Sequence, residues 1–414
     1  MKPDLPIVIR KTCRICDSYS LIKLYSLGNL YISNFVKKGE PGIKAPLEMV
    51  MCDKCKLVQL RHSAPQEILY ARYYWYRSGV TDTMKKALRD ITSEIEKNIP
   101  LKSGDIVLDI GSNDGTLLRT YENKNLIKVG IEPALNLVKN GKQGVDIFIN
   151  DFWNIKSYKK NINKKAKIIT AIGMFYDMED PGKFIKDISL ALDKQGIFIT
   201  QLMCLKNMLD TNDVGNICHE HLEYYSLKTL KYLFEKNNLE IIDIKYNQVN
   251  GGSYRIFTRL FGSKVNPFKG AKTRLKYFFD SEKNLDSKKT HINFFNRIEE
   301  NKKKTVKFIK SEVSKGKKIW VYGASTKGNT ILQYFGINNK YIIGASERSP
   351  DKWGKVTIGT NIPIYSETVA RKAKPDYFLV LPYAFIDEFY KREKDWLRKG
   401  GKFILPLPKF KILS

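Results

Sequence analysis

Two periods of apolar residues run through the chain, and they predict its secondary structure. From about residue 80, short apolar runs alternate with stretches in which apolar residues recur every three or four positions. Residues 83–99 form the first amphipathic stretch, and the apolar run Ile106–Ile110 follows it. Short apolar runs separated by helical stretches are typical of parallel strands buried on both faces. We therefore expect an α/β fold with a mostly parallel, doubly wound sheet.

The same alternation divides the chain into parts. Further strands are predicted at 128–131, 168–172, 196–201, 239–246 and 254–260. A Lys-rich stretch of helical pattern follows, and the alternation restarts near residue 318. The pattern thus predicts a loop-rich segment over residues 1–78, an α/β domain over 79–261, a helical linker over 262–310 and a second, smaller α/β domain over 311–414.

The composition is that of a folded, basic protein. Of 414 residues, 43% are hydrophobic and 12% aromatic, which excludes a disordered chain. The 72 Lys and Arg residues against 43 Asp and Glu residues give a formal charge of +29, which favours an anionic partner. The lysines are scattered and form no single tail, so a solvated basic surface explains the charge as well. Nucleic acid is therefore the less favoured partner.

The sequence predicts a cytoplasmic protein with no membrane partner. No window approaches the roughly 18 to 20 apolar residues of a membrane helix. The first residues lack the apolar core and the cleavage site of a signal peptide.

Four of the six cysteines form two close pairs near the start of the chain. They are Cys13, Cys16, Cys52 and Cys55. Two C-x2-C knuckles supply four thiolates, which is the ligand set of a tetrahedral structural zinc. So small a loop-rich segment cannot fold on its hydrophobic core alone, and metal binding would supply the missing folding energy. The sequence predicts a structural Zn²⁺ site.

A glycine turn after the strand Ile106–Ile110 has the features of a nucleoside-binding loop. The strand carries Asp109, and Gly111 and Gly115 follow before a helix begins. Glycines let the backbone approach a ligand closely, and a helix N-terminus offers donors to it. The next predicted strand ends at Glu132, where a carboxylate can accept both hydroxyls of a ribose.

This turn resembles motif I of class I S-adenosylmethionine-dependent methyltransferases. The resemblance implies that Asp109 and Gly111 lie near the methionine end of S-adenosylmethionine and that Glu132 binds its ribose. It also implies cofactor contacts from Asn113, Gly115, Asp151 and Phe152, the last two flanking the adenine. Asn113 stands where many relatives have a glycine. The glycines that a dinucleotide-binding G-x-G-x-x-G loop requires would fall on Asn113 and Thr116, so the methyl donor is preferred over NAD.

The segment Cys218-His219-Glu220-His221 is the strongest candidate for catalysis. Two histidines with a carboxylate between them offer a base near neutral pH. The alternative is that such a histidine caps the following helix or satisfies a buried carbonyl. A metalloprotease is disfavoured because the histidines lack the four-residue helical spacing. A zinc deaminase is disfavoured because no cysteine follows Cys218.

Taken together, these motifs resemble the sugar C-methyltransferase family over nearly the whole chain. The resemblance implies a class I methyltransferase Rossmann-like sheet, flanked by a small N-terminal zinc-binding domain and a C-terminal Rossmann-like domain. It implies methylation of a carbon next to the ketone of a nucleotide-linked 4-keto deoxysugar. His221 would be the base, Glu220 would orient the sugar or that histidine, and His219 or a tyrosine at 73, 74 or 76 would hydrogen-bond the oxyanion, with Tyr76 the preferred one. Relatives often have tyrosine before His-Glu-His, whereas this chain has Cys218, whose thiol is a poor donor.

Candidate substrate-binding residues come from both predicted α/β domains. Arg255 and Lys327 are candidates for the diphosphate, and Tyr224 for the sugar. The stretch 174–181 follows the fourth strand and either lines the donor site or caps the next helix.

Two other functions stay open. One is a sugar O-methyltransferase that uses the same base on a hydroxyl. The other is an RNA-binding or RNA-modifying protein. The positive charge favours this function, but the chain lacks the Asn-Pro-Pro-Tyr tetrapeptide of adenine-N6 enzymes.

Overall fold

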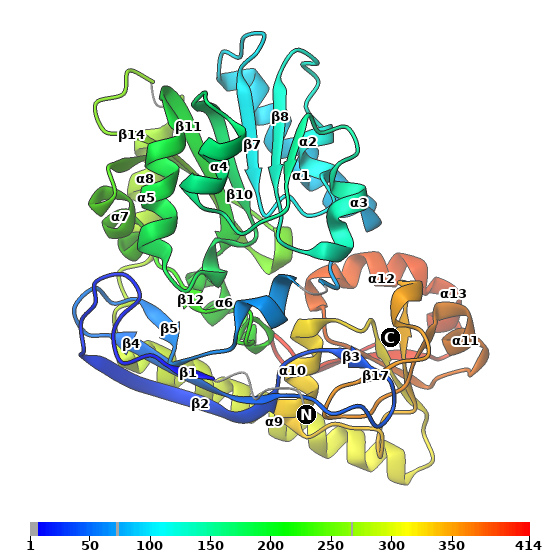
Figure 1. Cartoon of the computed structure of the whole chain (residues 1–414). Coiled ribbons are helices and arrows are strands. Elements are labelled where there is room, and N and C mark those ends of the chain that lie inside the picture. Colours follow the sequence, from blue (N-terminus) through cyan, green and yellow to red (C-terminus); the bar gives the residue numbers. More distant parts are fainter. Residues whose placement is uncertain (1–6, 72–73, 266–267) are drawn as a thin grey trace.

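Figure 1 shows the computed structural model of the chain, which describes residues 7–71, 74–265 and 268–414. The central domain contains a seven-stranded sheet in the order β13-β14-β11-β10-β7-β8-β9. The bounds of its strands are Ile106–Ile110 (β7), Ile127–Ile131 (β8), Ile147–Ile149 (β9), Ala166–Ile172 (β10), Leu192–Met203 (β11), Leu239–Asn247 (β13) and Ser253–Leu260 (β14). Strands β7 to β11 are parallel, while β14 is antiparallel to both of its neighbours. The predicted mostly parallel α/β sheet is confirmed.

Helices cover both faces of this sheet because alternate residues of its strands point to opposite sides. In β7, Val107 packs in the same apolar cluster as Leu88 and Ile91 of helix α1 (Asp82–Asn98). Its neighbour Leu108 belongs to the core on the other face, together with Ile185 of helix α5 (Pro181–Ala191). The remaining helices of the domain are α2 (Thr116–Arg119), α3 (Val138–Gly141), α4 (Ile155–Asn161), α6 (Leu205–Asp210) and α7 (Leu227–Lys236).

The N-terminal domain is built on an antiparallel sheet that a strand of the central domain completes. Its own strands are β2 (Leu21–Tyr31), β4 (Lys44–Cys52) and β5 (Val58–Leu60). The fourth strand, β12 (Glu223–Tyr224), pairs with β5 and directly follows the His-Glu-His segment. Two short pairs, β1 (Val8–Ile9) with β6 (His62–Ser63) and β3 (Phe35–Val36) with β17 (Val356–Thr357), add to this domain, and β17 comes from the third domain. The N-terminal domain is thus joined by strand pairing to both other domains.

The third domain has a second sheet, in the order β18-β16-β15-β19-β20-β21. Its strands are β15 (Ile319–Tyr322), β16 (Gly344–Glu347), β18 (Ile364–Ser366), β19 (Tyr377–Val380), β20 (Lys402–Leu405) and β21 (Lys411–Leu413). All neighbours are parallel except β20 and β21. The helices are α10 (Thr326–Phe335), α11 (Glu367–Lys372), α12 (Ile386–Arg392) and α13 (Lys394–Arg398), and α10 begins directly after the glycine turn that follows β15.

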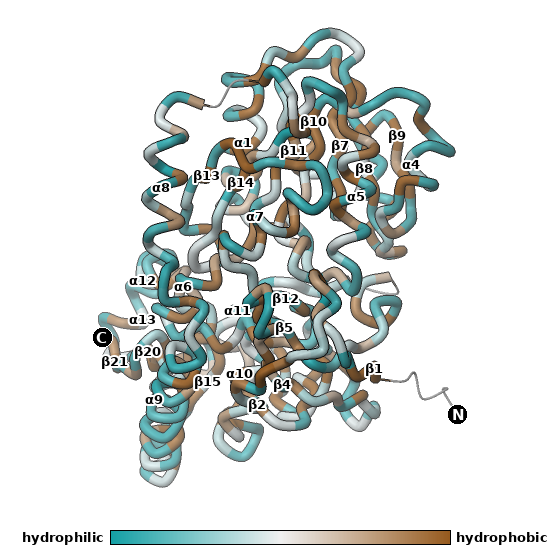
Figure 2. The backbone as a smooth tube through the Cα atoms, turned by 90° about the vertical axis from the view of Figure 1, so that its left-hand side faces the viewer, coloured by the Kyte–Doolittle hydropathy of each residue, from teal (hydrophilic) through white to brown (hydrophobic). Residues whose placement is uncertain are grey.

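The predicted linker forms two helices that pack on different domains (Figure 2). Helix α8 (Ala271–Ser281) lies on β13, where Arg274 forms an ion pair with the fully buried Asp243. Helix α9 (Lys288–Ser314) lies along β2, and the ring of Phe295 stacks on Tyr25 with 4.9 Å between centroids. No helix in the described part of the chain, α9 included, is long and apolar enough to cross a membrane.

Candidate active site

The four predicted cysteines come together in one cluster. Their sulfur atoms all lie within 4.8 Å of one another, with 3.4 Å between Cys13 and Cys55 and 3.5 Å between Cys16 and Cys52. Sulfurs around a tetrahedral Zn²⁺ at 2.3 Å bonds are about 3.8 Å apart, so the cluster has the size and the chemistry of a zinc tetrathiolate. With four thiolates the site is closed to substrate and serves the fold.

A cavity of about 410 Å³ lies beyond the carboxyl ends of β7, β8 and β10, where a ligand of such a sheet is expected. Four of the predicted cofactor residues line it, namely Gly111, Asn113, Glu132 and Phe152. The carboxylate of Glu132 accepts hydrogen bonds from the backbone N–H groups of Asn113 and Ala134, each at 2.9 Å. Burial raises the pKa of Glu132. Glu132 therefore braces the glycine turn and also faces the cavity, which we name the donor cavity.

Asn113 explains the departure from glycine in the turn. It has a left-handed backbone with φ of +53°. Its side-chain oxygen accepts from the N–H of Ser78 at 2.9 Å, and its amide donates to the carbonyl of Tyr76 at 3.1 Å. The next residue, Asp114, accepts from the N–H of Gly79 at 2.8 Å. The turn therefore holds residues 76–79, the segment that leaves the zinc domain, against the donor cavity.

The other three predicted cofactor residues, Asp109, Gly115 and Asp151, lie next to this cavity without lining it. Asp109 is buried beneath the turn, accepts a hydrogen bond from the Thr170 hydroxyl at 2.6 Å and has a pKa raised to about 7 by burial. Gly115 has φ of +77°, and a Cβ there would lie 2.9 Å from the carbonyl oxygen of Gly141. The carboxylate of Asp151 accepts hydrogen bonds from the Ser157 hydroxyl and from the backbone N–H of Phe152.

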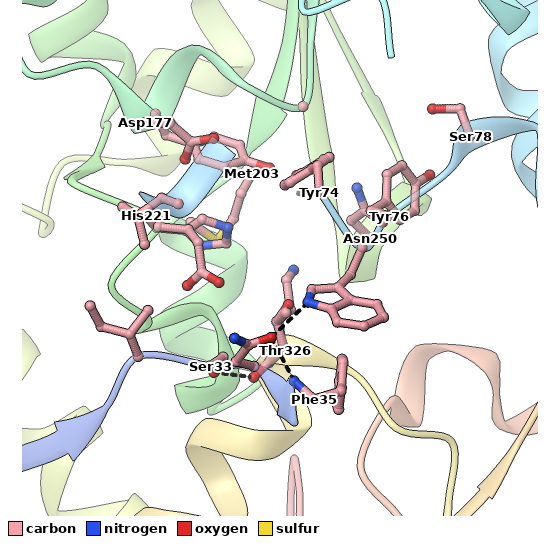
Figure 3. Close-up of a pocket in the computed structure, with 18 of the residues that line it drawn as sticks. Ser33, Phe35, Tyr74, Tyr76, Ser78, Asp177, Met203, His221, Asn250 and Thr326 are labelled. Carbon is pink, nitrogen blue, oxygen red and sulfur yellow. Dashed lines mark hydrogen bonds between the residues drawn. The ribbon is translucent and has the colours of Figure 1, made fainter. Parts of the chain in front are cut away.

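A second cavity of about 730 Å³ lies between the three domains, and we name it the acceptor cavity (Figure 3). Residues of the zinc domain, the central domain and the third domain all contribute to its wall. It shares six wall residues with the donor cavity: Tyr74, Tyr76, Ser78, Ile172, Gly173 and Asp177. The two cavities meet at these six residues.

His221 lies in the wall of the acceptor cavity with one ring nitrogen already bonded. Its Nδ1 lies 2.8 Å from the carbonyl oxygen of Asn216. A carbonyl can only accept, so Nδ1 carries the hydrogen and Nε2 keeps a free lone pair. The edge of the ring packs against Tyr176 with 4.6 Å between centroids. Burial, helped by the charge of Lys327, lowers the pKa of His221 to about 3, which keeps the imidazole neutral.

Two carboxyl groups share this wall with His221. Glu220 lines the cavity, its backbone carbonyl accepts from the Tyr70 hydroxyl at 2.5 Å, and its Oε2 is buried without a hydrogen-bond partner among the described residues. Burial raises its pKa. Asp177 lies on the same side of the cavity as His221, as Figure 3 shows, while Tyr76 and Ser78 lie across from them. Lys327, from the start of α10, is the only lysine or arginine in the described wall of this cavity.

Three predicted site residues, His219, Tyr224 and Arg255, form hydrogen bonds or ion pairs outside the two cavities. The Nε2 of His219 lies 2.9 Å from the carbonyl of Ala45, so this histidine ties the segment to strand β4. The buried Tyr224 hydroxyl donates to the carbonyl of Asn216. Arg255 is committed to Glu94, Asp90 and Gln201 and lines neither cavity.

The sequence reasoning missed Asn216, which sets the tautomer of His221, and the zinc-domain residues Ser33, Asn34 and Phe35 in the cavity wall. No motif marks any of them. Tyr73, one of the tyrosines proposed for the oxyanion, lies outside the described residues.

Comparisons with known proteins find three domain families along the chain. A zinc binding domain family matches residues 13–70, a methyltransferase domain family matches 81–244, and a C-methyltransferase C-terminal domain family matches 248–408. The C-methyltransferase NovU of Streptomyces niveus is 27% identical over 409 residues, which are 97% of this chain and 96% of that protein.

Solved structures also resemble part of the chain. An S-adenosylmethionine-dependent methyltransferase from Clostridium acetobutylicum is 15% identical, covers 43% of this chain and 92% of its own, and has a TM-score of 0.34. The magnesium protoporphyrin IX methyltransferase of Synechocystis is 11% identical, covers 42% and 78%, and has a TM-score of 0.32. The three family matches and the relative that aligns over nearly the whole chain show that the protein is an S-adenosylmethionine-dependent methyltransferase. It has the zinc-binding, methyltransferase and C-methyltransferase C-terminal domains.

Proposed function

We propose that this enzyme methylates a carbon next to the ketone of a nucleotide-linked keto sugar. The observation that carries the proposal is the bonding of His221. Its Nδ1 is held by the Asn216 carbonyl, and its Nε2 is left as a neutral base in the wall of the acceptor cavity. A carbon beside a ketone is acidic enough for such a base only when base and substrate are held in position.

In this proposal the chain's residues prepare the acceptor carbon. His221 Nε2 takes the proton from the carbon, and the electron pair spreads onto the ketone oxygen as an enolate. The resulting imidazolium is unfavourable in so buried a site, and the unpartnered Oε2 of Glu220 is positioned to offset its charge. S-adenosylmethionine, when bound, supplies the electrophilic methyl group. Tyr74 and Tyr76, which line both cavities, would enclose the reacting atoms and exclude water.

The other end of the acceptor cavity suits an anionic group. Lys327 lies where the third domain meets the cavity, and the described residues offer it no hydrogen bond or ion pair. A diphosphate bound here would form an ion pair with the Lys327 ammonium group. Arg255 cannot share this role because its guanidinium is already bonded to two carboxylates.

The same observations weigh on the alternatives. The base could deprotonate a sugar hydroxyl equally well, so O-methylation stays as the second candidate. RNA stays the less favoured alternative, because the described wall of this cavity offers one lysine and no arginine to a chain of phosphates.

The test is a reaction with S-adenosylmethionine labelled with ¹³C in the methyl group and a panel of nucleotide sugars, half of them 4-keto. Product mass and carbon NMR report the site of methylation. A new carbon–carbon bond beside the ketone supports the proposal. A methyl group on oxygen, or no reaction with any keto sugar while the donor binds, contradicts it.

A further inference from the structure

An unpaired carboxyl oxygen lies where the donor and acceptor cavities meet. Asp177 is one of the six residues that line both cavities. It is 5% exposed, and its Oδ1 is buried without a hydrogen-bond partner in the described part of the chain. Buried polar atoms normally have a hydrogen-bond partner, so an unpaired oxygen at this point indicates that a bound ligand supplies the partner.

The backbone of Asp177 is held firmly while its carboxyl group is left available. Its N–H donates to the carbonyl of Met174, and its own carbonyl accepts from the Gln66 side chain at 3.0 Å. The preceding residue, Tyr176, packs its ring against His221. Asp177 is therefore anchored next to the proposed base and on the same side of the cavity (Figure 3).

The surroundings of Asp177 favour the protonated carboxyl. Burial raises its pKa well above the usual range, and the carboxyls of Glu223 and Glu220 raise it further. The charge of Lys327 and the nearby Tyr70 hydroxyl oppose this without reversing it. A protonated carboxyl is an O–H donor, which an ionised one is not.

The thiol of Cys218 does not compete for this role. It is buried and lines neither cavity. A thiol is also a weak donor. The described residues that offer an O–H group at the junction are thus Asp177, Tyr74, Tyr76 and Ser78, and only the first has a buried oxygen without a partner.

We propose that Asp177 is a catalytic residue that donates a hydrogen bond from its carboxyl group to the acceptor oxygen on which negative charge develops. The proposal rests on the function proposed above. As the carbon–hydrogen bond breaks, the proton passes to His221 Nε2 and the electron pair moves onto the ketone oxygen, where Asp177 stabilises it and keeps its own proton. The pair then forms the new carbon–carbon bond, and the pair of the broken sulfur–methyl bond stays on sulfur.

The test compares Asp177→Ala and Asp177→Asn with Asp210→Asn, which changes an exposed acid on α6 outside both cavities. Loss of one such donor should lower kcat about 10²- to 10³-fold in Asp177→Ala. The dissociation constant for S-adenosylmethionine should stay within about twofold, because the methionine and ribose contacts remain. Asp177→Asn can still donate through its amide, so it should recover part of kcat. It should also lose the decline of kcat that ionisation of Asp177 causes at high pH in the wild type.

A merely structural carboxyl would not produce this pH change. The proposal is overturned if Asp177→Ala keeps kcat within about threefold of wild type, or if Asp177→Asn keeps the wild-type decline at high pH. A wild-type enzyme that methylates no keto sugar overturns the proposed function instead, and the role of Asp177 falls with it.

Discussion

The side chain of Arg14, which lies inside the first zinc knuckle, forms a buried ion pair with Glu223. Arg14 Nε lies 3.5 Å from Glu223 Oε1, and neither side chain is exposed to solvent. Arg14 also donates to the carbonyl of Leu60 at 2.6 Å. Glu223 begins β12, two residues after His221, and β12 completes the sheet of the zinc domain. The zinc domain therefore helps to position the proposed base.

Replacing Arg14 should test this connection. Arg14→Gln leaves Glu223 without its charge partner in the interior and should lower the free energy of unfolding by about 3 kcal/mol. Arg61→Gln is the matched control, because it breaks a half-exposed ion pair with Glu48 in the same domain and should cost less than about 1 kcal/mol. Urea unfolding of both variants with zinc bound gives the comparison. Equal losses would contradict a special role for the Arg14–Glu223 pair.

Asn113→Gly should weaken binding of the methyl donor. Glycine suits the left-handed backbone at this position, so the turn itself is not strained. The variant loses the hydrogen bonds to Ser78 and Tyr76, which hold residues 76–79 against the donor cavity. At about 1 kcal/mol for each of the two bonds, the dissociation constant for S-adenosylmethionine should rise up to about 30-fold in calorimetry. An unchanged constant would mean that this segment does not contribute to the donor site.

Asp109 should make stability depend on pH. Its pKa is near 3.8 in the unfolded chain and about 7 in the fold, so the folded protein binds the proton more tightly. Its contribution is complete below about pH 4 and is lost as the pH rises through 7. Asp109→Asn cannot ionise, so from pH 5 to 8 it should become more stable relative to wild type by about 2.5 kcal/mol. Urea unfolding across this range is the measurement, and a constant difference would contradict the burial argument.

Substitution of Lys327 and of Arg255 should have different effects, the first on KM and the second on stability. Lys327→Met removes the cation of the acceptor cavity and should raise KM for the nucleotide sugar about 10- to 100-fold, with the free energy of unfolding within about 0.5 kcal/mol of wild type. Arg255→Met instead removes one of the two cations paired with Glu94, the other being Lys245, and should lower the free energy of unfolding by about 2 kcal/mol. The same KM change in both variants would contradict this division of roles.

The sequence predicted best what depends on neighbouring residues. The strand Ile106–Ile110 is found with its predicted bounds, because its four apolar residues define it locally. The four cysteines come from two tight knuckles, so their meeting required only one long-range contact. Glu132 could be placed because it directly follows β8, the strand beside that one.

Side chains whose partners are distant in sequence were not predictable. His219 bonds a carbonyl 174 residues away, and Arg255 bonds a carboxylate 161 residues away. Before the chain folds, nothing distinguishes these two from residues that are free to bind a ligand. The acceptor cavity could not be predicted for the same reason, because residues of three domains form it. The zinc-domain residues in its wall belong to no motif.

The most direct test of the account is exchange of the acidic proton in D₂O. The enzyme is incubated with a nucleotide-linked 4-keto sugar and S-adenosylhomocysteine, and proton NMR follows loss of the signal beside the ketone. Wild type and His219→Gln should catalyse exchange, because His219 only ties the segment to Ala45. His221→Ala should slow it by at least about 10²-fold. Wild-type exchange rates in His221→Ala would contradict the claim that His221 Nε2 is the base.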